Sequence, residues 1–307
     1  MAEFDVLILG GGPAGISAAM WADELGLSSA IVDRGVALGG QLFNVFNPIK
    51  NYPGAEFENG TAMAAVLAGQ IGNRSTKLLL GREVTNVDTS ERKLTFADGS
   101  SVSGRSLILA TGVRRRRLDV PGESEFLGKG ILTSGAKDPT VVSGKTVAVI
   151  GGGDAALENA LILAAHAKRV LLIHRGSGLS ARPGFVSKVI AEEKIELILD
   201  SEIVEFPGHE MLNSVEIKNK LTNHTERRSV DHALIRIGFQ PNSDLFRDQV
   251  NCDAHGYVQV DVKGLTTVGR VYAGGDLWRQ FSQTVSSAVG DGTTAISNIA
   301  FNHAATS

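Results

Sequence analysis

Two glycine-rich turns are the parts of this sequence best suited to bind a ligand. The first has the spacing Gly10-x-Gly12-x-x-Gly15 and joins an apolar run, residues 4–10, to a helix-forming run, residues 16–27. Gly10 permits a tight turn, Gly12 lets the backbone approach a diphosphate, and Gly15 allows a helix to pack closely on a strand. A helix that begins here directs its free N–H groups at the phosphates. The pattern therefore predicts a dinucleotide site.

An acidic residue completes this first pattern. Asp33 follows a second apolar run, residues 29–32, and is placed to accept hydrogen bonds from the hydroxyl groups of a ribose. A strand, a turn, a helix and a second strand within about 30 residues form a βαβ unit. A glycine turn with both flanking strands and this acid is much more specific than glycine spacing alone.

A second copy of the pattern lies near the middle of the chain. Gly151-x-Gly153-x-x-Ala156 follows an apolar run, residues 145–150, and opens a helix-forming run, residues 155–167. Alanine in the third position is an accepted variant of the pattern. The sequence therefore predicts two dinucleotide-binding domains in one chain.

The two copies differ in the residue that would meet the ribose. His174 ends the next apolar run, residues 170–173, at the position that corresponds to Asp33, and Arg175 follows it. No acid is present there to bind a 2′-hydroxyl group. A cationic residue suits a 2′-phosphate instead, which favours NADP over NAD.

Further predicted strands and a final helix surround the two copies. Residues 106–110 and 269–273 are further apolar runs that end in glycine-containing turns, and residues 284–302 predict a final helix. We therefore expect an α/β fold with two Rossmann-like, three-layer dinucleotide-binding domains.

Composition narrows the possible function classes. The chain has 307 residues, a formal net charge of -3 and one cysteine, Cys252. This charge does not suggest binding to nucleic acid or to a membrane surface. No apolar run reaches the roughly 18 residues that a membrane span needs. A single cysteine excludes an intrachain disulfide and fits a reducing compartment, so we expect a cytoplasmic protein, and we assign no metal site.

Four further segments resemble those of a known flavoprotein family. They are Gly39-Gly40-Gln41-Leu42, Asn51-Tyr52-Pro53-Gly54, Ala110-Thr111-Gly112 and Gly274-Gly275-Asp276. Their order and spacing resemble the flavin-binding segments of the thioredoxin reductase family, among the class II pyridine nucleotide-disulfide oxidoreductases. The resemblance covers almost the whole chain. It implies that the second domain, residues 116–245, is inserted into the first, which comprises residues 1–115 and 246–307. It also implies FAD in the first domain, a nicotinamide nucleotide, NADP(H) or NAD(H), in the second, and a homodimer.

The resemblance also implies roles for individual residues. Asp33 would meet the ribose of the adenosine, Asp276 would meet the ribityl or diphosphate region, and Gln41 would lie near the flavin. The full set of expected FAD contacts is Gly10, Gly12, Pro13, Ala14, Gly15, Asp33, Arg34, Gly40, Gln41, Asn51, Val84, Ala110, Thr111, Gly112, Gly275, Asp276, Gln283 and Thr284. The expected contacts of the second nucleotide are Gly153, Asp154, Ala155, His174, Arg175, Arg182, Ile237 and Gly238.

The second site departs from the family pattern. Relatives that use NADPH have His-Arg-Arg, and another arginine a few residues later, where this chain has His174-Arg175-Gly176. Arg182 lies nearby but is shifted relative to that pattern. It either compensates for the missing arginine or is a solvated surface residue.

The redox-active dithiol of the family is absent. Relatives that reduce thioredoxin carry Cys-x-x-Cys-Asp before the second turn, and in this chain Ser134 and Lys137 occupy the two cysteine positions. Disulfide reduction requires a thiolate that attacks a sulfur atom. We therefore reject direct disulfide reduction. We assign no catalytic residue, because hydride transfer between the cofactors needs no side chain as acid or base.

The expected function is electron transfer between NAD(P)H and an acceptor outside the chain. The thioredoxin-reductase-like ferredoxin–NADP reductases also lack the dithiol, which implies an acidic electron-transfer protein such as ferredoxin as a partner. The run Arg114–Arg117 is either a docking patch for it or a solvated edge. Two alternatives remain. One is a flavoprotein that is independent of nicotinamide, either ferredoxin-linked or holding a second nucleotide or flavin. The other is a non-catalytic flavin sensor.

Overall fold

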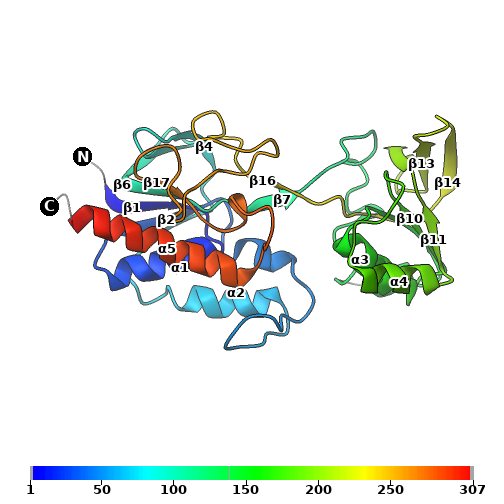
Figure 1. Cartoon of the computed structure of the whole chain (residues 1–307), viewed down its shortest axis with the longest axis horizontal. Coiled ribbons are helices and arrows are strands. Elements are labelled where there is room, and N and C mark those ends of the chain that lie inside the picture. Colours follow the sequence, from blue (N-terminus) through cyan, green and yellow to red (C-terminus); the bar gives the residue numbers. More distant parts are fainter. Residues whose placement is uncertain (1–2, 138, 305–307) are drawn as a thin grey trace. The chain divides into compact units, whose positions relative to one another are not determined.

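The computed structural model describes residues 3–137 and 139–304, which form two compact units. The first unit comprises Met1–Arg114 and Gln240–Ser307, and the second comprises Arg115–Phe239. Each unit contains a parallel sheet with helices on it (Figure 1). The predicted fold class, α/β with two Rossmann-like domains, is confirmed.

The chain passes between the units at two short strands, β7 (Val113–Arg115) and β16 (Phe239–Pro241), which pair with each other. Residues 240–245, which the sequence analysis assigned to the inserted domain, cluster with the first unit instead. The reason is local hydrogen bonding. The N–H of Asn242 donates to the carbonyl of Gly112 at 2.9 Å, and its side-chain amide donates to the carbonyl of Thr111 at 2.8 Å.

The first unit is built on a sheet with the strand order β3-β2-β1-β6-β5-β4, in which β17 also pairs with β6. The pairs are parallel except for β4 with β5 and β5 with β6. Most residues of β1 and β2, and the last four residues of β6, are buried on both faces, as expected for a covered parallel sheet. The strands are β1 Phe4–Leu9, β2 Ser29–Asp33, β3 Lys77–Leu80, β4 Val84–Asp88, β5 Lys93–Phe96, β6 Ser101–Leu109 and β17 Val271–Ala273.

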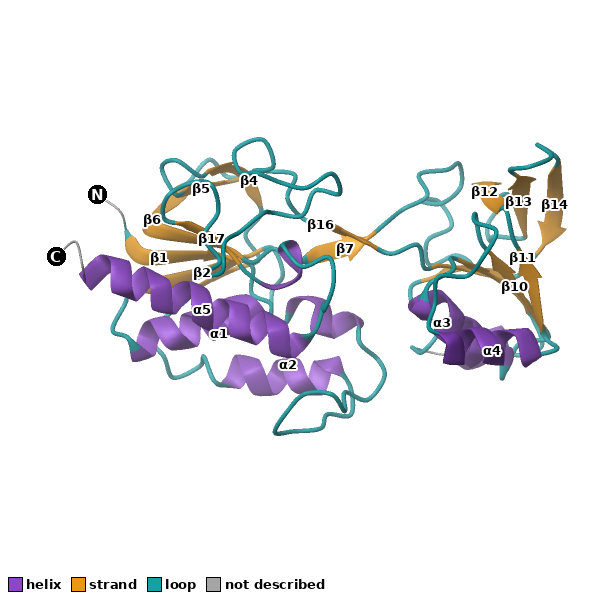
Figure 2. Ribbon diagram, viewed as in Figure 1, coloured by secondary structure: helices purple, strands orange, loops and turns teal. Residues whose placement is uncertain are grey.

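Helices α1 (Pro13–Glu24), α2 (Gly60–Gly69) and α5 (Val285–Ala304) lie on one side of this sheet (Figure 2). Their apolar residues form one core with the sheet, which includes Ile8 and Ile296. The short 3-10 helices Gly40–Asn44 and Gly275–Leu277 lie in the loops of the same unit.

The second unit repeats this plan with the parallel strand order β11-β10-β9-β15-β8. One core joins this sheet to the helices, and another joins it to an antiparallel sheet, β12-β13-β14. The elements are β8 Ile131–Leu132, β9 Thr146–Ile150, α3 Asp154–Ala164, β10 Arg169–Ile173, α4 Pro183–Ala191, β11 Ile195–Ile198, β12 Ser201–Glu205, β13 Ser214–Asn219, β14 Thr225–Ser229, β15 His232–Ile235 and the 3-10 helix Pro139–Val142. Within the described ranges of the chain, no helix is both long and apolar enough to cross a membrane.

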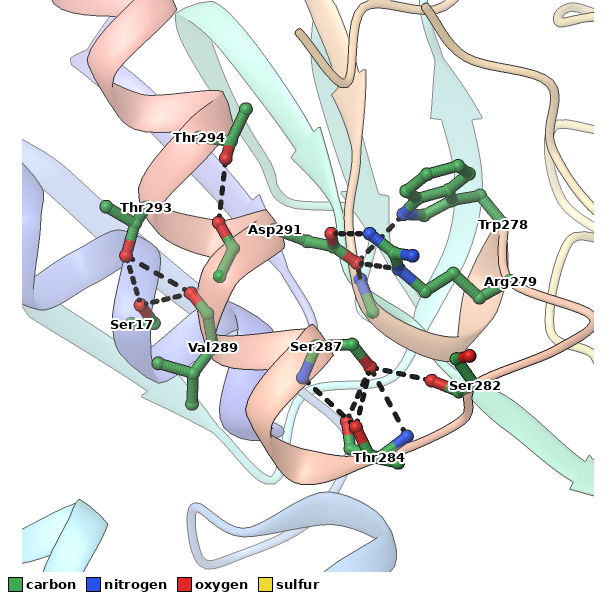
Figure 3. Close-up of polar contacts among 12 residues, drawn as sticks. Ser17, Trp278, Arg279, Ser282, Thr284, Ser287, Val289, Asp291, Thr293 and Thr294 are labelled. Carbon is green, nitrogen blue, oxygen red and sulfur yellow. Dashed lines mark hydrogen bonds and ion pairs between the residues drawn. The ribbon is translucent and has the colours of Figure 1, made fainter. Parts of the chain in front are cut away.

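Close packing of α1 against α5 depends on a glycine. A Cβ on Gly292 would lie 2.2 Å from the carbonyl oxygen of Ala14 and 2.9 Å from the backbone nitrogen of Ala18. At the same contact the Ser17 hydroxyl donates to the carbonyl of Val289 at 2.8 Å (Figure 3). A side chain at position 292 would therefore separate the two helices.

The variant Gly292→Ala should lower the free energy of unfolding of the first unit by about 1–3 kcal/mol, because the added methyl group overpacks this contact. The matched control is Gly290→Ala in the same helix, where a Cβ meets nothing within 4 Å. The control should be neutral or stabilising by up to about 1 kcal/mol, since alanine favours helix. Tryptophan fluorescence in a urea titration reports on this unit, because Trp21 and Trp278 both belong to it. Equal effects of the two substitutions would contradict the packing argument.

Candidate nucleotide-binding sites

The first glycine turn closes against a neighbouring strand. Gly10, with a φ of 115°, donates its N–H to the carbonyl of Val32 at 2.8 Å. A Cβ on Gly10 would lie 2.2 Å from the carbonyl oxygen of Ala110, and a Cβ on Gly15 would lie 1.9 Å from that of Gly10. Neither position accepts a side chain, so these glycines hold the strand, the turn and the helix together.

Gly12 is the open position of this turn. A Cβ at Gly12 would meet nothing within 4 Å, and Gly12 is the N-cap residue of α1 without a side-chain cap. Pro13 occupies the first position of the helix, where a missing N–H costs nothing. The first turn of α1 therefore keeps N–H groups for an anion, and the backbone at Gly12 leaves room for it.

Asp33, the residue expected to meet a ribose, accepts hydrogen bonds from the backbone of this turn. One carboxylate oxygen accepts from the N–H of Gly11 at 2.6 Å, and the other accepts from the N–H of Gly35 at 2.7 Å. Each oxygen retains a lone pair for a ribose hydroxyl. The N–H of Arg82 donates to the carbonyl of Asp33 at 3.1 Å, which places the start of β4, at Val84, two residues from this contact.

Three of the four other predicted flavin segments, those that contain Gly40, Ala110 and Gly275, come together at this turn. A Cβ on Gly40 would lie 3.1 Å from the Cα of Gly12, and a Cβ on Gly275 would lie 3.2 Å from the Cβ of Ala14. Ala110 joins them through the contact with Gly10 described above. Segments far apart in the sequence thus meet at the carboxyl ends of β1, β6 and β17, where open α/β sheets bind their ligands.

Several predicted contact residues hold their own segments in place. The side-chain amide of Gln41 donates to the carbonyl of Val113 at 2.7 Å, and the Thr111 hydroxyl donates to the carbonyl of Asn242 at 2.8 Å. These bonds fix the loops on either side of the turn.

Gln283 and Thr284, the predicted contact residues near the start of α5, also make hydrogen bonds within their own unit. The side-chain amide of Gln283 donates to the Tyr257 hydroxyl at 3.4 Å, and the Thr284 hydroxyl lies 3.0 Å from that of Ser287 (Figure 3). Arg34 and Asn51 are exposed, and their side chains make no hydrogen bond within residues 3–137 and 139–304.

Asp291 of α5 is a central residue of this site that the sequence analysis missed. Its carboxylate is buried and accepts from the N–H of Gly275 at 3.0 Å and from the Trp278 indole at 2.9 Å (Figure 3). It also forms a two-point ion pair with Arg279, at 2.9 and 2.6 Å. The sequence feature that could have identified Asp291 is an acidic residue between Gly290 and Gly292, in a helix with few other charged residues. Asp291 thereby fixes the loop that carries Asp276.

Asp276 has the most perturbed carboxyl group of the site. Burial raises the pKa of Asp276 to about 6, and the nearby negative charge of Asp291 contributes to the increase. The Asp276 side chain is half-buried and accepts no hydrogen bond from the described part of the chain. A carboxylate with unused acceptor sites beside an open glycine turn fits a ligand that presents hydroxyl groups.

The second turn repeats the geometry of the first. A Cβ on Gly151 would lie 2.2 Å from the carbonyl oxygen of Arg236, whereas the nearest atom to a Cβ on Gly153, in Ser180, is 3.9 Å away. Gly153 is the N-cap residue of α3, again without a side-chain cap. Gly151 is closed by its neighbour and Gly153 is open, so the backbone at Gly153 leaves room beside the N-terminus of α3.

The cationic residues beyond the second turn are not equivalent. Arg182 donates to the Asp154 carboxylate at 2.6 Å, and its guanidinium lies over the Phe185 ring. Arg175 is exposed and forms no ion pair within the described ranges. Burial lowers the pKa of His174, whose imidazole lies against Gly152, and the charge of Arg175 lowers it further. Of the two arginines expected at this site, Arg175 is therefore the one without an ion pair within the described ranges.

The remaining residues predicted for the second site lie beside these groups. Ala155 is in the first turn of α3, where its carbonyl accepts from the Asn159 side chain at 2.7 Å. Ile237 and Gly238 follow β15, and Gly238, with a φ of 95°, is exposed.

The segment that replaces the dithiol is anchored to α3. Gly135 is buried, and its N–H donates to the side-chain oxygen of Asn159 at 3.0 Å. The Ser134 hydroxyl accepts from the N–H of Ala136 at 3.2 Å. The free cysteine, Cys252, belongs to the first unit. Among residues 3–137 and 139–304, no group of three or more His, Cys, Asp or Glu side chains is arranged to hold a metal ion.

The pKa of Asp276 generates a prediction for the ligand-free protein. Folding raises this pKa from 3.8 to about 6. The free energy of unfolding therefore falls as the pH rises from about 4 to 6, because the buried carboxyl group must lose its proton, and this destabilisation is constant above pH 6. Asp276→Asn should therefore be more stable than the unmodified protein by about 1–3 kcal/mol above pH 6. This difference in stability should shrink toward pH 4.

Thermal unfolding of both proteins between pH 4 and 8 measures this difference in stability. The control is Asp88→Asn, which removes an acid whose pKa is lowered by the N–H of Glu91 and by Ser90, so that variant should lose stability above pH 4. A gap for Asp276→Asn that does not change with pH would contradict the shifted pKa.

Comparisons with known proteins agree with this geometry. The family model described as pyridine nucleotide-disulphide oxidoreductase matches residues 4–292. A 34.2 kDa protein in the rubredoxin operon of Clostridium pasteurianum is 27% identical over 95% of both chains. A thioredoxin reductase of Helicobacter pylori strain J99 is 32% identical over 95% of this chain and 96% of the relative.

Solved structures show the same relationship. The crystal structure of Lactococcus lactis thioredoxin reductase in its FR conformation has a TM-score of 0.86 and 29% identity, and it covers 99% of this chain and 100% of the other. The cofactors of this thioredoxin reductase-like family are FAD and NADPH. Because the family model spans nearly the whole chain, the protein belongs to the pyridine nucleotide-disulphide oxidoreductase family and is a thioredoxin reductase-like flavoprotein oxidoreductase.

Proposed function

We propose that this protein passes electrons between NAD(P)H and an acceptor outside the chain, and that it is not a disulfide reductase. The segment Ser134–Lys137 carries this proposal, because it holds no sulfur and is anchored through Gly135 to Asn159. Cys252 is the one cysteine of the chain, so no redox-active dithiol can form within it.

The first unit fits FAD. The open turn at Gly12 and the uncapped start of α1 would hold the diphosphate, and Asp33 would accept a hydrogen bond from the ribose of the adenosine. Asp276, which accepts no hydrogen bond from the described chain, would accept one from a hydroxyl group of the ribityl chain. Bound FAD supplies the redox chemistry, in which a hydride is taken up and electrons leave singly or in pairs. The chain supplies binding and orientation.

The second unit fits a nicotinamide nucleotide with one cation for a 2′-phosphate. Gly153 and the start of α3 would hold the diphosphate, and Arg175 would pair with the 2′-phosphate. Arg182 is paired with Asp154, so in this proposal Arg182 does not replace the arginine that the family has at position 176. We therefore expect a moderate preference for NADPH over NADH.

The acceptor in this proposal is a small acidic electron-transfer protein such as ferredoxin, and the protein acts as a cytoplasmic homodimer. The relative from a rubredoxin operon supports an acceptor of this kind. The run Arg114–Arg117 gives less support to an acidic partner. Arg114 pairs with Asp244 at 2.6 Å, and Arg117 lies 3.5 Å from Glu123, so these side chains serve the fold.

One observation favours a second candidate function. Since Arg175 alone remains for a 2′-phosphate and Gly176 follows it, the second unit would bind NADPH less firmly than its relatives do. A nicotinamide-independent flavoprotein, either ferredoxin-linked or holding a second nucleotide or flavin, would explain this. Identification of the small molecules released by denaturation separates the candidates, because a flavin-to-protein ratio near one argues against a second flavin.

Anaerobic titration with NADPH and NADH should bleach the flavin absorbance of the unmodified protein. Arg175→Gln should raise the Kd for NADPH about 10-fold, because it removes one charge-assisted contact with the 2′-phosphate, and should change the Kd for NADH less than about 2-fold. Arg182→Gln is the matched control and should change neither by more than about 2-fold. No bleaching by either nucleotide would overturn the proposal, and equal effects of Arg175→Gln on both nucleotides would refute the 2′-phosphate assignment.

The variant Cys252→Ser should reduce ferricyanide with NADPH at the unmodified rate, within about 2-fold, because electrons leave the flavin without a thiol intermediate. Neither form should reduce the disulfide of thioredoxin. NADPH consumption and thiol release, measured together, check both statements. Thioredoxin reduction that disappears in Cys252→Ser would show that the chain uses a thiol after all.

A further inference from the structure

Arg279 is joined to the last helix of the first unit by a two-point ion pair. Its guanidinium donates to both carboxylate oxygens of Asp291 in α5, at 2.9 and 2.6 Å (Figure 3). The same guanidinium lies over the Trp278 ring, 4.2 Å from its centroid, and the Trp278 indole donates to the Asp291 carboxylate at 2.9 Å. Two-point pairs of this kind are strong and directional. Arg279 is therefore held in one place, although its side chain is only partly buried.

The ion pair closes the short loop that carries Asp276. Before Asp276, the N–H of Gly275 donates to the Asp291 carboxylate at 3.0 Å. After it, Arg279 binds the same carboxylate. The Asp276 side chain itself accepts no hydrogen bond within residues 3–137 and 139–304. The position of the Asp276 carboxyl group is therefore set by the contacts of its neighbours with Asp291.

Arg279 also holds the start of the segment that leads to the expected flavin contacts. Residues 280–281 are exposed, and the next anchor is the carbonyl of Ser282, which accepts from the Ser287 hydroxyl at 2.7 Å. Gln283, an expected flavin contact, follows directly. The ion pair of Arg279 thus lies between the loop expected to meet the ribityl chain and the segment expected to meet the flavin ring.

We propose that Arg279 is a positioning residue for FAD, which acts through Asp291. It holds Gly275 and Asp276 in the arrangement that accepts a ribityl hydroxyl group, and it neutralises a carboxylate that would otherwise add a second negative charge beside Asp276. Neutralisation favours an ionised Asp276, which is the stronger hydrogen-bond acceptor. The inference goes beyond the proposed function, because it concerns the retention of FAD and does not depend on the electron donor or acceptor.

The charges around Asp276 support this role. Burial raises the pKa of Asp276 to about 6, and the negative charge of Asp291 contributes. Hydrogen bonding to Asp291 raises the pKa of Arg279, so Arg279 stays a cation. The turn at residues 10–16 and strand β17, which also adjoin this loop, contain no charged residue. Without Arg279, the charge of Asp291 would act on Asp276 unopposed, and Asp276 would take up a proton at higher pH.

The test measures the Kd for FAD between pH 5 and 8 on the full-length holoprotein. Serial dilution releases FAD, and flavin fluorescence at equilibrium reports the free fraction. In the unmodified protein the Kd should be constant at high pH and rise as the pH falls below about 6, because Asp276 then takes up a proton. Arg279→Gln should raise the Kd about 10-fold at pH 8, and its further rise should begin about one pH unit higher.

Asp291→Asn separates the effect of charge from that of packing. Asparagine still offers an oxygen to the N–H of Gly275 but carries no negative charge. The rise in Kd should therefore begin at lower pH than in the unmodified protein, opposite to the shift in Arg279→Gln. Arg279→Lys keeps the charge and should keep the pH profile of the unmodified protein. Arg105→Gln is the matched control, because it removes another ion pair of the first unit, with Asp5 at 3.3 Å, and should change the Kd less than about 2-fold.

Two results would overturn the inference. One is a Kd at pH 8 that Arg279→Gln leaves unchanged. The other is a pH profile that Arg279→Gln and Asp291→Asn leave in the same place, since a merely structural contact would weaken FAD binding equally at every pH. If Arg279→Gln does not fold, the pH profile of Asp291→Asn decides alone. Neither NADPH nor an acceptor is present, so a protein that shows these shifts but is not reduced by NADPH would refute the proposed function and leave this inference standing.

Discussion

A steric contact between a glycine and a neighbouring carbonyl oxygen determines both nucleotide sites. Gly10 meets the carbonyl of Ala110, and Gly151 meets that of Arg236, each at a distance that leaves no room for a Cβ. The contact pins the turn that ends the first strand of each unit to the end of an adjacent strand. The following helix must then start at the carboxyl edge of the sheet with its N-terminus uncapped. The open glycines, the free N–H groups and the facing side chains all take their places from this constraint.

The two units share this glycine contact but place residues of different charge at the end of the second strand. Asp33 ends β2 and receives backbone N–H groups from Gly11 and Gly35, so an acid is built into the first turn. At the matching place His174 lies against Gly152, and burial lowers its pKa, so a neutral ring replaces the acid. The exposed charge nearby is then that of Arg175. This difference explains why one backbone plan can serve two nucleotides that differ at the ribose.

Local patterns could be predicted from the sequence, and long-range polar contacts could not. The strands and helices of both βαβ units were predicted because apolar runs and glycine spacing are local signals. Helix α1 begins at Pro13, three residues before the predicted start, since proline suits the first helical position. Strand β14 was missed because its residues are mostly exposed and polar. The contacts of Asp291 with Gly275 and Arg279, and that of Arg182 with Asp154, depend on how distant segments pack.

The segment Ser134–Lys137 shows how a family fold can retain its frame without the two cysteines of the dithiol. Gly135 has no Cβ, and a Cβ there would lie 2.7 Å from the Asn159 oxygen that binds its N–H. Arg236 holds the preceding carbonyl of Thr133. The segment is therefore a packed part of the second unit, although neither sulfur is present. Since the backbone contacts do not need the dithiol, its loss leaves both nucleotide turns intact. In the proposed function, electrons that reach the flavin therefore leave to an acceptor outside the chain.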